Sequence, residues 1–246
     1  MRIPRIPVLL AATLATLSTA PAHALTNGSF ESAFLGWTTL GDVSLYDEFV
    51  TQGFVTSLIG TASATNADDD LVGLPAGEAN FSGVSPIPAP ALTSALGLSA
   101  NAFDTTAVAF EGSAVWQDIT VNAGDTLLID WTFVSIDPRI ADYAFASIGN
   151  QVFHLADRND IMFVDDGIGF SLGQTFSQVF AHGGVTRIGI GVVDIGDVLG
   201  SSLVLADNAR LVAAPVPEPE SYALLLAGLG LLGCMTRRRK AAPAEP

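Results

Sequence analysis

Short runs of apolar and small polar residues, bounded by Gly, Asn, Asp and Pro, recur along residues 25–214. This pattern is typical of β-strands separated by turns. It predicts strands at 43–49, 107–110, 114–121, 126–136, 143–148, 151–155, 176–181, 185–193 and 202–212. No part of this body shows sustained helical spacing, and residues 71–98, rich in Pro, Gly, Ala and Ser, predict a long loop with short strands. Many short strands in one domain of this length predict an all-β fold, a β-sandwich or jelly roll.

The N-terminus has a different pattern, with a basic start and a short apolar run. Arg2 and Arg5 precede the apolar residues 8–17, and Ala22-His23-Ala24 offers a small-x-small cleavage site. These features predict a signal peptide over residues 1–24, which signal peptidase removes after Ala24. The alternative, a membrane anchor, is disfavoured because a bilayer-spanning helix needs about 20 apolar residues.

The C-terminus has three consecutive parts. Residues 216–221 are proline-rich and polar, residues 222–235 are uncharged and rich in Leu, Gly and Ala, and residues 237–240 are three arginines and a lysine. Prolines favour an extended chain in the first part. The apolar run followed by cations predicts a short transmembrane helix over 222–235, with the basic cluster 237–240 on the cytoplasmic side.

Pro-Glu-Pro at 217–219, the apolar run and the arginine cluster together resemble the PEP-CTERM sorting signal, over residues 215–240. The resemblance implies that exosortase, a membrane enzyme, recognises Pro217, Glu218 and Pro219. It also implies export across the inner membrane, transient anchoring through the C-terminal helix, and delivery to the cell envelope or the extracellular space. Such a tag is an address and not an activity.

The body carries a second resemblance, to jelly-roll carbohydrate-binding-like modules. Asn27-Gly28-Ser29-Phe30-Glu31 followed by Gly36-Trp37 is similar to their opening, residues 115–119 and 123–125 to their middle, and residues 202–211 to their closing strand. In those modules the first and last strands often share a bound calcium ion. The resemblance implies calcium ligands at Glu31 and Asp207, the alternative being that both are surface residues at strand ends.

Charge narrows the range of partners. Residues 25–214 hold 22 acidic residues, four arginines and no lysine, a formal balance of −18. A body of this charge repels phosphates, so we expect no nucleic-acid binding. The acidity serves solubility or binds cations, and the loops at 68–70 and at 157–160 with 165–166 offer further oxygen ligands for calcium. The single cysteine, Cys234, lies outside the body, which therefore has no disulfide.

Catalytic patterns are scarce. The body has two histidines, His154 and His182, without zinc-binding spacing, and it has no Gly-x-Ser-x-Gly elbow. We therefore expect no enzymatic activity. Sugar recognition would need exposed aromatic rings, and Trp37, Trp116, Trp131, Tyr46 and Tyr143 are the candidates by type. Trp116 and Trp131 lie in apolar strands and are expected in the core, which leaves Tyr46 as the best exposed ring.

Two functions fit these observations. The first is a structural or adhesive protein of exopolysaccharide or biofilm. The alternative is a carbohydrate-binding module for exopolysaccharide. An exposed aromatic groove on the sandwich would separate the second from the first.

Overall fold

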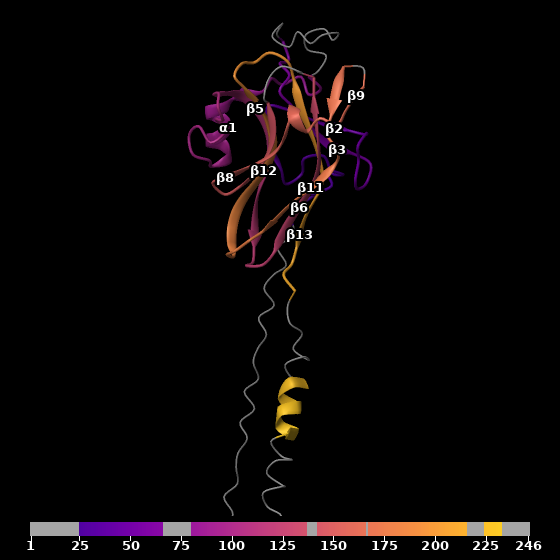
Figure 1. The fold of residues 1–246 in the computed structure, drawn as a ribbon, viewed down its shortest axis with the longest axis vertical. Coiled ribbons are helices and arrows are strands. Elements are labelled where there is room, and N and C mark those ends of the chain that lie inside the picture. The colour runs from indigo at the N-terminus through magenta and orange to yellow at the C-terminus, as the bar shows by residue number, and fades with distance from the viewer. Residues whose placement is uncertain (1–24, 66–79, 137–141, 166, 216–223, 233–246) are drawn as a thin grey trace, which may run out of the picture.

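The computed structural model describes residues 25–65, 80–136, 142–165, 167–215 and 224–232 (Figure 1). The predicted signal peptide, the loop at 68–70 and the Pro217–Pro219 motif lie outside these residues. The body is a two-layered β-sandwich, and the all-β prediction is confirmed. Both sheets and all the clusters of buried apolar residues belong to residues 25–214, so this body has a complete core of its own.

The described body contains strands of very different length and one α-helix. In chain order the elements are β1 Thr38–Leu40, β2 Asp42–Tyr46, β3 Thr56–Gly60, β4 Ile87–Pro88, α1 Ala89–Leu96, β5 Ala109–Val121, β6 Thr126–Ser135, β7 Tyr143–Ile148, β8 Gln151–Asp157, the 3-10 turn η2 Arg158–Asp160, β9 Phe163–Asp165, β10 Ile168–Phe170, β11 Gln174–Val179, β12 Gly184–Ile195 and β13 Ser202–Val212.

The strand order is that of a jelly roll. One sheet runs β1-β5-β12-β7-β8, with β4 also paired to β5; the other runs β2-β3-β13-β6-β10-β9, with β11 also paired to β6. All pairings are antiparallel. Along the chain, β3, β5, β6 and β7 alternate between the sheets, the β7–β8 hairpin stays in one sheet, and β11, β12 and β13 alternate again. This connectivity places β3 beside β13 and brings the two ends of the body together.

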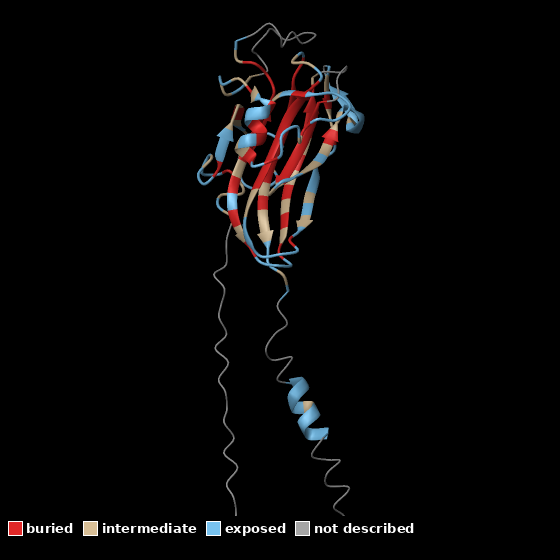
Figure 2. Cartoon of the chain, turned by 90° about the vertical axis from the view of Figure 1, so that its left-hand side faces the viewer, coloured by how far each residue is buried: buried red, intermediate tan, exposed pale blue. Residues whose placement is uncertain are grey.

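The main core lies between the sheets. It contains Ile59, Phe133, Val192 and Val204, all fully buried, together with Trp131. A second cluster lies between α1 and the outer face of the β5–β12–β7 sheet, and Figure 2 shows the buried strands of that sheet behind the helix. A third, smaller cluster lies on the outer face of the other sheet.

Several elements differ from the sequence prediction, among them the short strands β1, β9 and β10, which were not predicted. The stretch Glu111-Gly112-Ser113 reads as a break, but β5 continues through it. The glycine reflects close packing, because a side chain on Gly112 would approach within 2.5 Å of the Val192 carbonyl oxygen. β3 was not predicted, since its polar Thr56 and Ser57 precede only a short apolar pair. The predicted loop 71–98 ends in α1, where Leu92 and Leu96 pack on the sheet and Gly97 ends the helix with a positive φ of 74°.

The C-terminal apolar stretch is helical over residues 224–232, and all its described side chains are exposed or half-exposed (Figure 2). Within the described residues, no helix reaches the length and apolar character needed to cross a membrane. A membrane-spanning helix over 222–235 therefore stays a prediction.

Candidate functional site

The outer face of the β3–β13–β6 sheet is apolar where an exposed sheet face is usually polar. Ile59 and Val204 point into the main core, so their strand neighbours Leu58, Leu203 and Leu205 point outward. Val134 of β6 joins them. An antiparallel sheet normally presents polar side chains to water on its outer face. These four side chains are buried, with 3–7% of their surface exposed, so they form a covered apolar patch that can serve as the floor of a groove.

Aromatic rings from four segments surround this patch and form a groove. Tyr46 and Phe81 lie with ring centroids 6.0 Å apart, while Phe170 stacks against Phe163 at 5.1 Å and against Phe49 at 5.7 Å. The resulting hollow has a volume of about 310 Å³. Phe49, Phe81 and Phe163 each keep about half of their surface exposed (46%, 51% and 49%). The groove therefore offers ring faces and edges to a ligand.

Few polar groups line the groove, and they are all acidic or hydroxyl groups. The Tyr46 hydroxyl donates a hydrogen bond to Glu48 Oε2 at 3.3 Å, and Asp165 also lines the groove. Burial raises the pKa of Tyr46, and the negative charge of Glu48 raises it further. Tyr46 thus keeps its proton at neutral pH, and the two carboxylates can accept hydrogen bonds from ligand hydroxyls.

A second, polar hollow continues the groove along β6. The outward side chains of β6 change from Val134, which lines the aromatic groove, to Thr132 and Asp130, which line a hollow of about 490 Å³ with Arg210 and Gln174. Burial tends to raise the pKa of Asp130. Hydrogen bonds from the Thr175 hydroxyl and the Asn208 amide, with the charge of Arg210, outweigh this and lower the pKa. The binding surface therefore has an aromatic end and a charged end.

The predicted calcium ligands Glu31 and Asp207 lie beside the loop that carries Phe49 into the groove. Asp207 Oδ2 accepts hydrogen bonds from Thr51 N and Gln52 N, both at 2.7 Å, and from the Thr51 hydroxyl at 3.0 Å. Glu31 Oε1 accepts from Phe54 N at 2.7 Å and Val55 N at 3.1 Å. The two carboxylates thus fasten residues 51–55, the second half of the loop at residues 47–55.

A similar anchor holds Phe81. Asp42 is fully buried, and its Oδ1 accepts a hydrogen bond from Ser82 N at 3.0 Å. Burial raises the pKa of Asp42, although its hydrogen bonds with Ser82 act against this shift. Two walls of the groove are therefore held by buried carboxylates and backbone amides.

Calcium at Glu31 and Asp207 stays a prediction. The described residues contain no group of three or more acidic, histidine or cysteine side chains that could hold a metal ion. In the acidic segment 157–160, Asp157 Oδ1 accepts from Asn159 N and Asp160 Oδ2 accepts from Asp157 N, so these carboxylates cap the turn η2.

The aromatic residues considered from the sequence have different environments. Trp37 and Trp131 are in the main core. Tyr143 is buried and its hydroxyl donates to the Phe103 carbonyl oxygen at 3.0 Å. Trp116 is half-buried on the outer face of the other sheet, where the Arg187 guanidinium lies 3.6 Å from its ring centroid. Tyr46 alone among them lines the groove.

The C-terminal segment has a direct match among known families. Residues 215–240 match the PEP-CTERM protein-sorting motif. The motif implies an exported protein that exosortase processes, with a destination in the envelope or outside the cell. Because the match covers only the tag, it does not describe the body.

No curated protein sequence matches the chain. Among solved structures, TmCBM61 in complex with beta-1,4-galactotriose aligns with 78% of this chain and 98% of its own at 11% identity and a TM-score of 0.42. TmCBM27, described for mannan recognition, aligns over 79% and 97% at 14% identity and a TM-score of 0.40. A structure titled for CBM4 aligns over 74% and 98% at 10% identity and 0.33. The jelly-roll assignment rests on this chain's own strand order.

Sequence reasoning missed the phenylalanines of the groove, because it considered only tryptophan and tyrosine as sugar platforms. A usable signal was present. Phe163 and Phe170 lie in short segments on either side of Gly167 and Gly169, where a hairpin with exposed rings would be expected.

Proposed function

We propose that the protein is an exported, envelope-sorted binding protein whose body holds a neutral carbohydrate in the groove formed by Tyr46, Phe49, Phe81, Phe163 and Phe170. The observation that carries this proposal is the half-exposed aromatic groove on an apolar sheet face. Ligand sites are typically concave and apolar, with a few polar groups that fix orientation.

The chemistry of the groove suits a sugar. A pyranose ring has an apolar C–H face that packs on aromatic rings, and hydroxyl groups at its edge. Glu48 and Asp165 can accept hydrogen bonds from those hydroxyls, and such bonds to charged acceptors are stronger than neutral ones. The same carboxylates, in a body with a formal charge of −18, would repel uronic acids and sulfated or phosphorylated sugars. We therefore propose neutral glycans as the ligand class.

A binding role also accommodates the adhesive role in exopolysaccharide or biofilm. A protein that is sorted to the envelope and binds the polysaccharide around the cell would attach this polysaccharide to the envelope. The groove favours this reading over a purely structural role. We propose no catalytic function, because the groove contacts combine ring packing with hydrogen-bond acceptors and include no nucleophile held beside a base.

The proposed route to the envelope has three steps. Signal peptidase removes residues 1–24 after Ala24, residues 222–235 hold the exported chain in the inner membrane, and exosortase then acts at Pro217, Glu218 and Pro219. The match of residues 215–240 to the sorting motif supports the last step.

A glycan array probed with the purified body, residues 25–214, tests the proposed function. We expect signals on neutral hexose oligosaccharides and none on uronic-acid or sulfated chains. Increasing salt would then leave the neutral signals unchanged, because they depend on ring packing and hydrogen bonds. An array without neutral glycan signals would contradict the proposal.

A further inference from the structure

The main core gives way to polar side chains at one end of the sandwich. Alternation along the strands turns these side chains inward. On β13, Leu203 lies on the outer face and Val204 in the core, so Ser202 faces the interior. On β12, Val193 and Ile195 pack with α1, so Asp194 between them also faces the interior. The remaining members of this layer by the same alternation are Thr61, Ser135 and Asp142.

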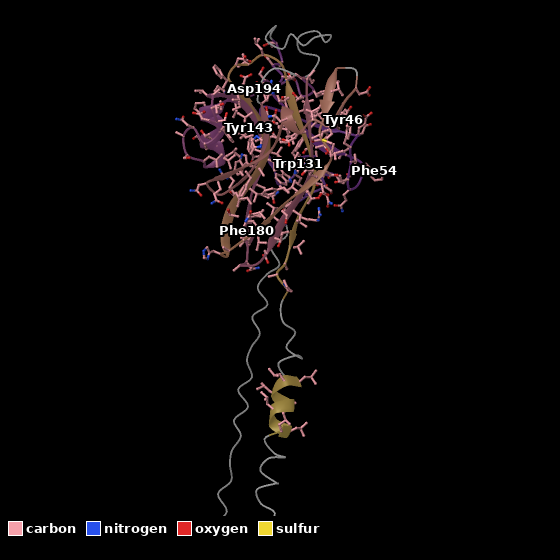
Figure 3. All side chains as sticks on the ribbon, in the orientation of Figure 1. Tyr46, Phe54, Trp131, Tyr143, Phe180 and Asp194 are labelled. Carbon is pink, nitrogen blue, oxygen red and sulfur yellow. The ribbon has the colours of Figure 1, made fainter. Side chains whose placement is uncertain are left out.

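Two carboxylates of this layer are deeply buried. Asp142 is 3% exposed and Asp194 is 1% exposed. Asp142 Oδ1 accepts a hydrogen bond from Ile195 N at 2.9 Å, and its Oδ2 accepts one from the Ser202 hydroxyl at 3.1 Å. Within the described parts of the chain, neither oxygen of Asp194 accepts a well-formed hydrogen bond. Asp194 lies in the upper part of the body, well above Trp131 and Phe180 (Figure 3).

Among the described residues, the groups that act on Asp194 do not neutralise its charge. Burial raises the pKa of Asp194 well above its ordinary value, the negative charge of Asp142 raises it further, and only the Thr61 hydroxyl acts in the opposite direction. The body has no lysine. Arg187 is paired with Asp118, and Arg210 with Asp130. A buried carboxylate without a partner is costly, and two side by side are more so.

We propose that the carboxylates of Asp142 and Asp194 bind a calcium ion between the two sheets. Calcium accepts six to eight oxygen ligands at about 2.3–2.6 Å, in flexible geometry. Neither oxygen of Asp194 accepts a well-formed hydrogen bond among the described residues, and the hydroxyls of Thr61 and Ser202 can add further oxygen ligands. Magnesium retains several water molecules and an octahedral geometry, so a dry interior site favours calcium.

This site is separate from the groove and from Glu31 and Asp207. Its ligands come from both sheets. Asp142 directly precedes β7 and Asp194 lies in β12, in one sheet. Thr61 directly follows β3 and Ser202 is the first residue of β13, in the other sheet. A bound ion would join the sheets at this end of the body. The body has no cysteine, because the single cysteine of the sequence is Cys234. Calcium would thus supply the cross-link that a disulfide gives to many exported domains.

Calorimetric titration and thermal melting of the body test this proposal, because residues 25–214 hold the complete core. Calcium chloride should bind to one site and raise the melting temperature by about 5–10 °C over a chelator, while magnesium chloride should not. Asp194→Asn removes one charge with almost no change of shape, so it should fold and should melt at least as high as the wild type in chelator. It should have lost the response to calcium.

Asp207→Asn is the matched control, since it makes the same substitution at the other predicted calcium position. The proposal requires that Asp207→Asn keeps the calcium response that Asp194→Asn loses. A wild type that melts equally in calcium and chelator would overturn it, and so would an Asp194→Asn response equal to that of the wild type. Both outcomes are measured without a glycan, so they do not depend on whether the groove binds sugar.

Discussion

Replacing both Phe49 and Phe163 with alanine is expected to weaken binding of an array-selected neutral oligosaccharide about 100-fold, since buried aromatic anchors each contribute about 1–2 kcal/mol. The two rings stack on opposite sides of Phe170, at 5.7 and 5.1 Å, so together they form one wall of the groove. Each is only half buried, and therefore the double variant should remain folded. Calorimetric titration measures the change.

Phe54→Ala is the matched control for this variant. Phe54 is 83% exposed, does not line the groove and lies at the edge of the body (Figure 3). We expect Phe54→Ala to bind like the wild type. If it lost as much affinity as the double variant, the sugar would be held elsewhere, whereas unchanged binding by the double variant would exclude the groove as the site.

Asp207→Ala is expected to lower the free energy of unfolding by about 2–4 kcal/mol, because it leaves several backbone and hydroxyl donors without their charged acceptor. Asp207 is 1% exposed and accepts four hydrogen bonds, two from Thr51, one from Gln52 and one from Asn208. Denaturant unfolding of the body measures the loss.

Asp47→Ala provides the control, because it removes the same charge from an exposed position in the same loop. It should change stability by less than about 0.5 kcal/mol. Equal stability of both variants would show that Asp207 does not anchor the loop. Asp207→Ala should also weaken glycan binding, since the loop that it holds carries Phe49 into the groove.

The sequence predicted the sandwich because alternation and turn residues are local signals. The runs at 143–148 and 202–212 match β7 and β13 in both bounds. β3 escaped prediction because its place beside β13 depends on a pairing of distant segments, and its outward Leu58 is covered by distant rings. The short helix α1 escaped because two turns of spacing carry little periodicity.

The site was harder to predict than the fold. Tyr46, which was predicted to be the exposed ring, is half-buried and lines the groove, and Phe81 and Phe163 join it only through packing of segments far apart in the chain. Glu31 and Asp207 were predicted as calcium ligands that join the first and last strands, and this stays a prediction. The structure adds what the resemblance could not show, namely that their oxygens hold the backbone of residues 51–55.

The position of a bound sugar tests the central claim most directly. A crystal structure of the body with the array-selected oligosaccharide should show a sugar ring over Leu58 and Leu205, between Phe81 and Phe163, with hydroxyls directed to Glu48 or Asp165. The chain of sugars should continue along β6 toward Thr132 and Asp130. A sugar bound instead on the α1 side of the sandwich, with the aromatic groove unoccupied, would contradict the account.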